Sequence, residues 1–436
     1  MPGVLLTIGW IALFLFAIRR SSFFNAPGLS KRTIGSLFLL KIVAGTAMWW
    51  IYTFHFPDRA NADIYKYFDD GNIMFSALPD HPLDYLSMLF GIHNDQAHFD
   101  GEYYRVMHNW YRQYESNMYN DAHTMIRFNA FVRIFSFGVY HMHTVFACFF
   151  GIIGSVALYR TFVTFLAGHE RALTIAIFLL PSVLFWGSGV IKEALLFFGL
   201  GLFLFNVFGM LRDGARPLRV LTLVFCCVLL FFLKFYVLLS LIPALIAYVW
   251  CRRTKDRSAL LKYAVTYAVC IIIALNSSHI IPRFDIIDVL WVKQKDFIGM
   301  ATAAHAGSLV DVVRLERNAW SFVKRSPHAL YMTFLSPITA WRNGVLGLVS
   351  ATENIALIGS IAFFLTRRRP WRDVDKPLFY LCIGYCVLLA LVIGWTTPVI
   401  GALVRYRTPL LPFLLIAVLL IADPNRVKWP RWMHIK

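Results

Sequence analysis

The sequence contains few charged residues, and acidic ones are the scarcest. Only 15% of its 436 residues are charged, with 24 acidic against 42 basic side chains. Soluble domains usually carry about a quarter charged residues, so the low content excludes an ordinary cytosolic enzyme. Because 58% of the residues are hydrophobic, the composition instead predicts a polytopic membrane protein.

Cysteine is also scarce, and the seven that occur lie in or beside apolar stretches. Their spacing matches neither a disulfide framework nor a zinc site. The chain also lacks tandem repeats, low-complexity tracts and flexible Gly/Ser linkers. We therefore expect a single integral domain over residues 1–436, and nothing follows about redox chemistry.

Apolar stretches long enough, or nearly long enough, to cross a bilayer recur along the chain. We count eleven: 4–18, 34–54, 142–159, 172–187, 190–211, 218–233, 235–250, 260–276, 345–366, 377–396 and 408–422. The first lacks early basic residues and ends in Arg19 and Arg20, so we expect a retained span and not a signal peptide. The fold class predicted is all-α, with about 11 transmembrane helices.

The apolar stretch from 218 to 250 allows two interpretations. Two helices of 16 residues would each be roughly 24 Å long, which is short for a hydrocarbon core of about 30 Å. One tilted helix would invert the topology of everything downstream, placing the basic residues after Trp250 outside. We therefore favour a hairpin with Lys234 at its outer turn.

The formal charge of +18 is distributed unevenly over the predicted loops. With the N-terminus outside, almost all of the basic excess falls in short loops on the inner side. The positive-inside rule requires this distribution. Anionic nucleic acid is therefore not needed to explain the charge, and we expect no nucleic-acid partner.

Two longer segments, 55–140 and 277–344, lie on the predicted outer side. In the first, helical periodicity places Ile64, Phe68 and Gly71 on one stripe, whereas Asp63 and Asp70 fall on another stripe together with a lysine. This pattern predicts an amphipathic helix on the outer membrane surface.

Asp63 and Asp70 are the candidate catalytic residues. A carboxylate at the membrane rim can act as a general base, and Asp63 lies closer to the preceding span. Asp70 lies about 10 Å further along the helix. It is either a second functional acid or part of a solvated face balanced by Lys66.

The turn from Pro181 to Glu193 carries the most specific signal in the sequence. Pro181 breaks a helix, glycines follow, and Lys192-Glu193 stands at the start of the next span. Charges at that depth are expensive unless they are paired or used. We predict that Lys192 binds a phosphate and that Glu193 orients Lys192 or a sugar hydroxyl. The alternative is a self-satisfied ion pair.

Further cations fall on the same predicted side. Arg405 and Arg407 precede the last span and form a candidate phosphate clamp, although both could be interfacial anchors. Lys234 joins them at the outer turn described above. A carboxylate facing several cations fits transfer from a lipid phosphate donor, which needs a base and a group that stabilises the departing phosphate.

These features resemble the GT-C superfamily of membrane glycosyltransferases. The resemblance lies in the many spans, the Asp-x-Tyr element at Asp63 and Tyr65, the Pro181 to Glu193 turn, and the Arg-Tyr-Arg sequence ending at Arg407. The similarity extends to the overall arrangement of spans and loops over most of the chain, and the motifs that carry it are short. It implies a donor sugar linked to polyprenyl phosphate and a first-loop aspartate, here Asp63, as catalytic base. The family usually places that aspartate after its first span, whereas here it follows the second.

The leading hypothesis is therefore an inverting glycosyltransferase in the bacterial cytoplasmic membrane, with its active site facing the periplasm or exterior. Its partners would be a lipid-linked sugar donor, a glycan, lipid or protein acceptor, and membrane lipids. Some GT-C members need a divalent cation, but Asp69 and Asp70 are too few to argue for one.

Two other functions remain open. A polymerase or ligase of lipid-linked polysaccharide would use the arginine-rich stretch from Arg314 to Arg325. A transporter or flippase would need polar groups at the centres of the spans. Such groups are rare here, although Lys41 and Glu353 fall inside spans and Glu353 is a further site candidate.

Overall fold

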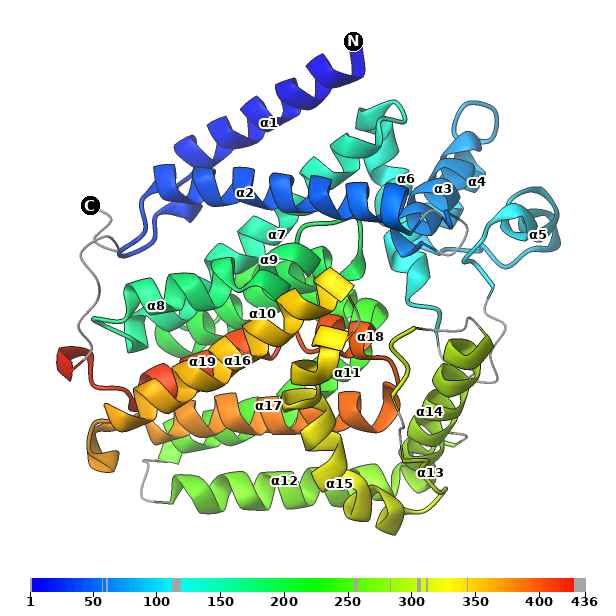
Figure 1. The fold of residues 1–436 in the computed structure, drawn as a ribbon. Helices are drawn as coiled ribbons and strands as arrows, with labels where there is room; N and C mark the ends of the chain where they lie inside the picture. Colours follow the sequence, from blue (N-terminus) through cyan, green and yellow to red (C-terminus); the bar gives the residue numbers. More distant parts are fainter. Residues whose placement is uncertain are drawn as a thin grey trace. The chain divides into compact units, whose positions relative to one another are not determined.

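The computed structural model describes residues 2–56, 58–59, 62–111, 119–254, 258–282, 284–303, 307–310, 313–342 and 344–426. These residues form helices joined by turns and contain no β-strand, only three isolated β-bridges (Figure 1). The all-α prediction is confirmed.

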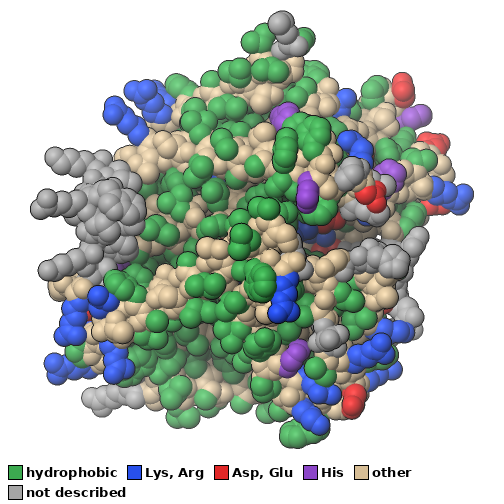
Figure 2. Space-filling view, in the orientation of Figure 1, with side chains coloured by type: hydrophobic (Ala, Val, Ile, Leu, Met, Phe, Trp, Pro, Cys, Tyr) green, Lys and Arg blue, Asp and Glu red, His purple; other side chains and the backbone are tan. Residues whose placement is uncertain are grey.

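Among the residues that the structure describes, seven helices are long and apolar enough to cross a membrane, or eight if a bent pair counts as one span. The seven are Pro2–Arg20, Lys31–His55, Tyr140–Phe165, Lys192–Asp213, Pro217–Thr254, Gly344–Thr366 and Lys376–Thr396. The predicted count of about eleven is not confirmed. Hydrophobic side chains spread over the face shown in Figure 2, as expected for a surface in contact with lipid.

The chain divides into two units, each built from separate stretches of sequence. Unit 1 comprises Met1–Gln113, Met118–Thr161 and Leu184–Phe235. Its helices are α1 (Pro2–Arg20), α2 (Lys31–Trp50), α3 (Asp63–Ser76), α4 (Pro82–Phe90), α5 (Ala97–Glu102), α6 (Ala122–Ser136), most of α7 (Tyr140–Phe162), α10 (Lys192–Asp213) and the first part of α11 (Pro217–Thr254).

Unit 2 comprises mainly Phe162–Val183 and Tyr236–Lys436. Its helices are α8 (Glu170–Thr174), the rest of α11, α12 (Ala259–Leu275), α13 (Ser277–Ile280), α14 (Ile286–Ala303), α15 (Ala319–Phe334), α16 (Gly344–Thr366), α17 (Lys376–Thr396), α18 (Ile400–Tyr406) and α19 (Leu411–Ile421). The short helix α9 (Pro181–Trp186) belongs partly to each unit.

In unit 1, α3 packs along α6 and does not lie bare on the membrane surface. Ile64 is fully buried and Phe68 is nearly so. Gly71 permits the close approach, because a Cβ there would lie 2.7 Å from the Cβ of Asn129. The apolar stripe predicted to face the membrane is therefore covered by another helix of the protein.

Glycines also allow α7 and α10 to approach closely. A Cβ at Gly154 would overlap the carbonyl oxygen of Phe197, and one at Gly201 would overlap the carbonyl oxygen of Gly154. Small residues at such contacts are typical of helix packing in membranes, where backbones approach closely to gain van der Waals contact. This contact fixes α10, whose first turn carries Lys192 and Glu193.

Helix α11 is interrupted once, at Lys234, whose backbone angles of φ −153° and ψ 76° are not helical. The stretch from 218 to 250 therefore consists of two helical segments that join at Lys234. The break lies next to the boundary between the two units, at Phe235.

Unit 2 contains helices that end inside the packed structure. Helix α15 lies along α17, where Phe322 and Trp395 are in ring contact at 5.2 Å and the Thr333 hydroxyl donates to the Ala390 carbonyl at 2.8 Å. Helices α18 and α19 form the bent pair, at an angle of 58°. Arg407 begins the break between them.

Candidate functional site

The first turn of α10 lies beside the start of α3 in unit 1. Ile191, the residue before α10, packs in one buried cluster with Ala62, Ile64 and Tyr65. Apolar packing therefore places the residue before Lys192 against Ala62 and Ile64, the two sequence neighbours of Asp63.

Lys192 is nearly buried and is held by residues of two other elements. Its Nζ lies 2.9 Å from a carboxylate oxygen of Asp121, which precedes α6, and 5.5 Å from the centre of the Tyr67 ring on α3. Tyr67 follows Asp63 by one helical turn, so both lie on the same face of α3. Lys192 is therefore on the side of α3 that carries Asp63.

Glu193 is paired with Lys234. The Lys234 Nζ donates to Glu193 Oε1 at 2.6 Å, and the side chains are 2% and 0% exposed. The alternative of a self-contained Lys192–Glu193 pair is not confirmed, because both side chains have ionic partners outside the pair. Each finds its partner on a different neighbouring element.

The two first-loop aspartates differ in their surroundings. Asp63 begins α3 and is half-buried. Asp70 is fully buried, and its two carboxylate oxygens accept the backbone N–H groups of His108 and Asn109, each at 2.8 Å. Burial raises the pKa of Asp70, although these two hydrogen bonds oppose the shift. Asp70 thus ties the loop at His108 and Asn109 to α3 and is not part of a solvated face; its catalytic use stays a prediction.

Asp70→Asn is expected to loosen the loop that contains His108 and Asn109. An amide can accept only one of the two backbone N–H groups through its oxygen, which leaves the other facing a donor, so we expect a loss of about 1–3 kcal/mol. Thermal unfolding and limited proteolysis near His108 would measure it. Asp95→Asn, at an exposed position of the same loop, is the control. Equal stability of the two variants would contradict this role for Asp70.

The turn before α10 runs along the middle of α2. The Lys41 Nζ donates to the Gly187 carbonyl at 2.8 Å and lies 3.4 Å from the Ser188 hydroxyl. A Cβ at Gly45 would overlap the Ser188 carbonyl oxygen. The turn that contains Gly187 and Ser188 is therefore packed inside unit 1. In the sequence, Lys41 stood out only as a single lysine within a predicted apolar span.

Aromatic side chains of the segment 55–140 stack on one another. The rings of Tyr104 and Trp110 are 4.0 Å apart and nearly parallel, and His123 stacks on the other face of Trp110 at 3.8 Å. Tyr104 and Trp110 are buried. These rings form a small core for the loop and do not present open faces to a sugar.

In unit 2, Arg407 is almost completely buried, with 1% of its surface exposed. Its Nη1 donates to Asn354 Oδ1 at 2.6 Å and to the Thr333 carbonyl at 3.3 Å, while Asn354 also donates to the Phe334 carbonyl. The carbonyl end of α15 is thus capped by a cation and an amide, which suits the negative end of a helix.

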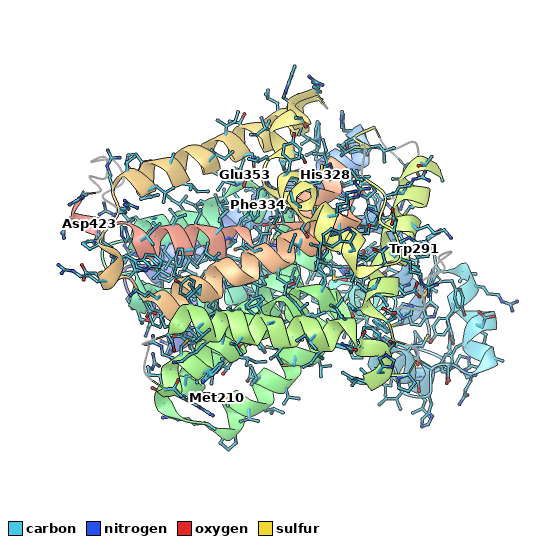
Figure 3. All side chains as sticks on the ribbon, turned by 90° about the horizontal axis from the view of Figure 1, so that it is seen from below. Met210, Trp291, His328, Phe334, Glu353 and Asp423 are labelled. Atoms are coloured by element: carbon cyan, nitrogen blue, oxygen red, sulfur yellow. The ribbon has the colours of Figure 1, made fainter. Side chains whose placement is uncertain are left out.

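Glu353, next to Asn354 on α16, is also buried and binds the start of α9. The backbone N–H of Ser182 lies 3.2 Å from Glu353 Oε2, and the Ser182 hydroxyl donates to the same oxygen. Glu353 also interacts electrostatically with Arg407. Figure 3 shows Glu353 and Phe334 near each other, where α16 meets the end of α15.

The two arginines of the predicted clamp have different surroundings, and their joint binding of a phosphate stays a prediction. Arg405 is half-buried on α18, whereas Arg407 is enclosed by α15 and α16. Residues two apart on a helical turn point in different directions. Asp63, Lys192, Glu193 and Lys234 belong to unit 1, while both arginines belong to unit 2.

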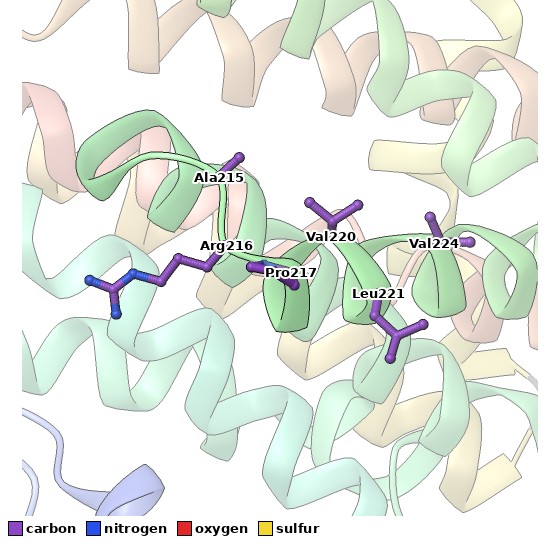
Figure 4. Close-up of a pocket in the computed structure, with 6 residues that line it drawn as sticks. All are labelled: Ala215, Arg216, Pro217, Val220, Leu221 and Val224. Carbon is purple, nitrogen blue, oxygen red and sulfur yellow. The ribbon is translucent and has the colours of Figure 1, made fainter.

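One apolar groove of about 550 Å³ lies at the start of α11 (Figure 4). It is lined by Ala215, Arg216, Pro217, Val220, Leu221 and Val224. None of the predicted site residues lines it, so it is not part of the candidate site.

Within the described ranges, no three His, Cys, Asp or Glu side chains gather in a way that could hold a metal ion. Whether the chain uses a divalent cation stays open. Comparisons of the chain with protein-family models, with curated proteins and with solved structures found no match.

Proposed function

We propose that the chain is a membrane glycosyltransferase. It transfers a sugar from a polyprenyl-phosphate-linked donor to a glycan, lipid or protein acceptor of the cell envelope. The reaction takes place on the outer face of the bacterial cytoplasmic membrane.

The observation that carries this proposal is the position of Lys192 over Tyr67, one turn from Asp63 on α3. A carboxylate and an ammonium group drawn from distant parts of the sequence thus share one side of α3. Transfer from a lipid phosphate needs a base and a cation within reach of one reacting centre.

In the proposed reaction, Asp63 removes the proton from an acceptor hydroxyl. The resulting oxygen nucleophile attacks the anomeric carbon, and the bond from that carbon to the phosphate oxygen breaks. The product is the inverted glycoside, and the leaving group is polyprenyl phosphate. Lys192 exchanges its contact with Asp121 for the phosphate, whose growing charge it stabilises. The buried Glu193–Lys234 pair holds the first turn of α10 in place.

Asp63→Asn tests the proposal. Removing a general base typically lowers a rate by about 10² to 10⁴ fold. The measurement is turnover of lipid-linked sugars by the purified protein in nanodiscs, at matched expression. Asp69→Asn on the same helix is the matched control, because Asp69 pairs with Arg59 at the surface. Unimpaired turnover in Asp63→Asn would remove Asp63 from the mechanism.

A transporter is the second candidate, and one observation favours it. Glu353 and Arg407 lie among helices that end or bend inside unit 2. Transporters often bind their substrates at such broken helices. Substrate flux into proteoliposomes without chemical turnover would support this alternative over sugar transfer.

A further inference from the structure

We infer that unit 2 contains an oxyanion subsite that takes the phosphate group of a lipid. It is formed by the edge of the Arg407 guanidinium that carries Nε and Nη2. This inference rests on the proposed function for the class of ligand. Its evidence comes from unit 2 alone.

The guanidinium is only partly satisfied. Nη1 has two acceptors, Asn354 Oδ1 and the Thr333 carbonyl. Nε and Nη2 are buried and have no hydrogen-bond partner among the residues that the structure describes. Leaving buried donors of a charged group unpaired is unfavourable, so the arrangement points to an acceptor that is not part of this chain.

The two unpaired groups lie on one edge of the guanidinium. The Nε–H bond and one Nη2–H bond are parallel, and this edge binds two oxygens of a single phosphate or carboxylate. Asn354 and the end of α15 fix the opposite side of the group. The edge is therefore held in a defined orientation before any ligand arrives.

Acidic residues near Arg407 do not fill this edge. Glu353, the nearby acid, is engaged by the backbone N–H and hydroxyl of Ser182 at the start of α9. The negative charge of Glu353 partly offsets the buried positive charge of Arg407. The Glu353 carboxylate oxygens meanwhile accept hydrogen bonds from Ser182 at the start of α9. An external oxyanion can thus bind Arg407 without displacing a direct ion pair.

The surroundings favour an anion carried on an apolar tail. Helix α16, which carries Asn354, exposes Leu348, Val349 and Ile355 on its outer side. The bend between α18 and α19 begins at Arg407, so the guanidinium lies at a break between two apolar helices. The apolar tail of a lipid phosphate is stabilised by burial among such apolar side chains. A free anion has no tail, so nothing of this kind offsets the cost of removing its charge from water.

Binding of radiolabelled farnesyl phosphate to the purified full-length protein in nanodiscs tests the inference. Farnesol has the same tail without the phosphate, and inorganic phosphate has the charge without the tail. Arg407→Lys keeps the charge but loses the two-donor edge, so we expect about tenfold weaker binding or more. Arg372→Lys, at an exposed arginine of the same unit, is the control and should bind like the wild type.

Asn354→Asp serves as a second variant if Arg407→Lys does not fold. It keeps an acceptor for Arg407 but adds a negative charge beside it, so binding should again weaken. Competition by farnesol equal to that by farnesyl phosphate would overturn the inference, as would binding that both variants leave unchanged. If inorganic phosphate displaced radiolabelled farnesyl phosphate at concentrations similar to those of unlabelled farnesyl phosphate, the oxyanion site would stand, but its ligand would be a free anion. These readouts do not use sugar transfer, so a negative Asp63→Asn result leaves them intact.

Discussion

Lys234→Met is expected to lower the free energy of unfolding by about 3–5 kcal/mol, the usual consequence of removing one partner of a buried ion pair. The remaining carboxylate of Glu193 is 0% exposed, so water cannot replace the lost ammonium group. The change also affects the point where α11 leaves helical geometry. Unfolding of the purified protein in mixed micelles would measure the loss.

A double-mutant cycle separates the ion pair from simple loss of packing. Glu193→Gln combined with Lys234→Met removes the uncompensated charge, so the double variant should be more stable than Lys234→Met alone. Lys324→Met, at an exposed position on α15, controls for the substitution itself. Equal stability of the single and double variants would mean that the buried charge does not matter.

Gly154→Ala is expected to destabilise the contact between α7 and α10. The added methyl group would overlap the Phe197 carbonyl oxygen, which belongs to the backbone and cannot rotate away. Overpacking of this kind typically costs about 1–3 kcal/mol. Thermal unfolding followed by tryptophan fluorescence would report it.

Gly9→Ala provides the matched control for Gly154→Ala. It makes the same chemical change within a span, but a Cβ at Gly9 meets nothing within 4 Å. We therefore expect Gly9→Ala to be neutral or slightly stabilising, because alanine favours helix more than glycine does. If both variants lost equal stability, helix propensity and not the α7–α10 contact would be the cause.

The sequence alone identified the membrane class of the chain and most positions of its long apolar helices. Hydropathy is a sum over neighbouring residues, so it is available without knowing which helices pack together. The same local reasoning located the break at Lys234 and the interrupted region after Pro181. Its count of about eleven spans is not confirmed, because short apolar stretches such as 172–187 form several short helical pieces in place of one long helix.

Only the tertiary structure decided which charges meet. Glu193 pairs with Lys234, Lys192 with Asp121, and Asp70 with two backbone N–H groups of the loop. The stripe on α3 looked like a membrane-facing surface because its periodicity does not reveal whether lipid or α6 covers it. Burial of a particular side chain depends on contacts between segments far apart in the chain, and a local pattern cannot encode such contacts.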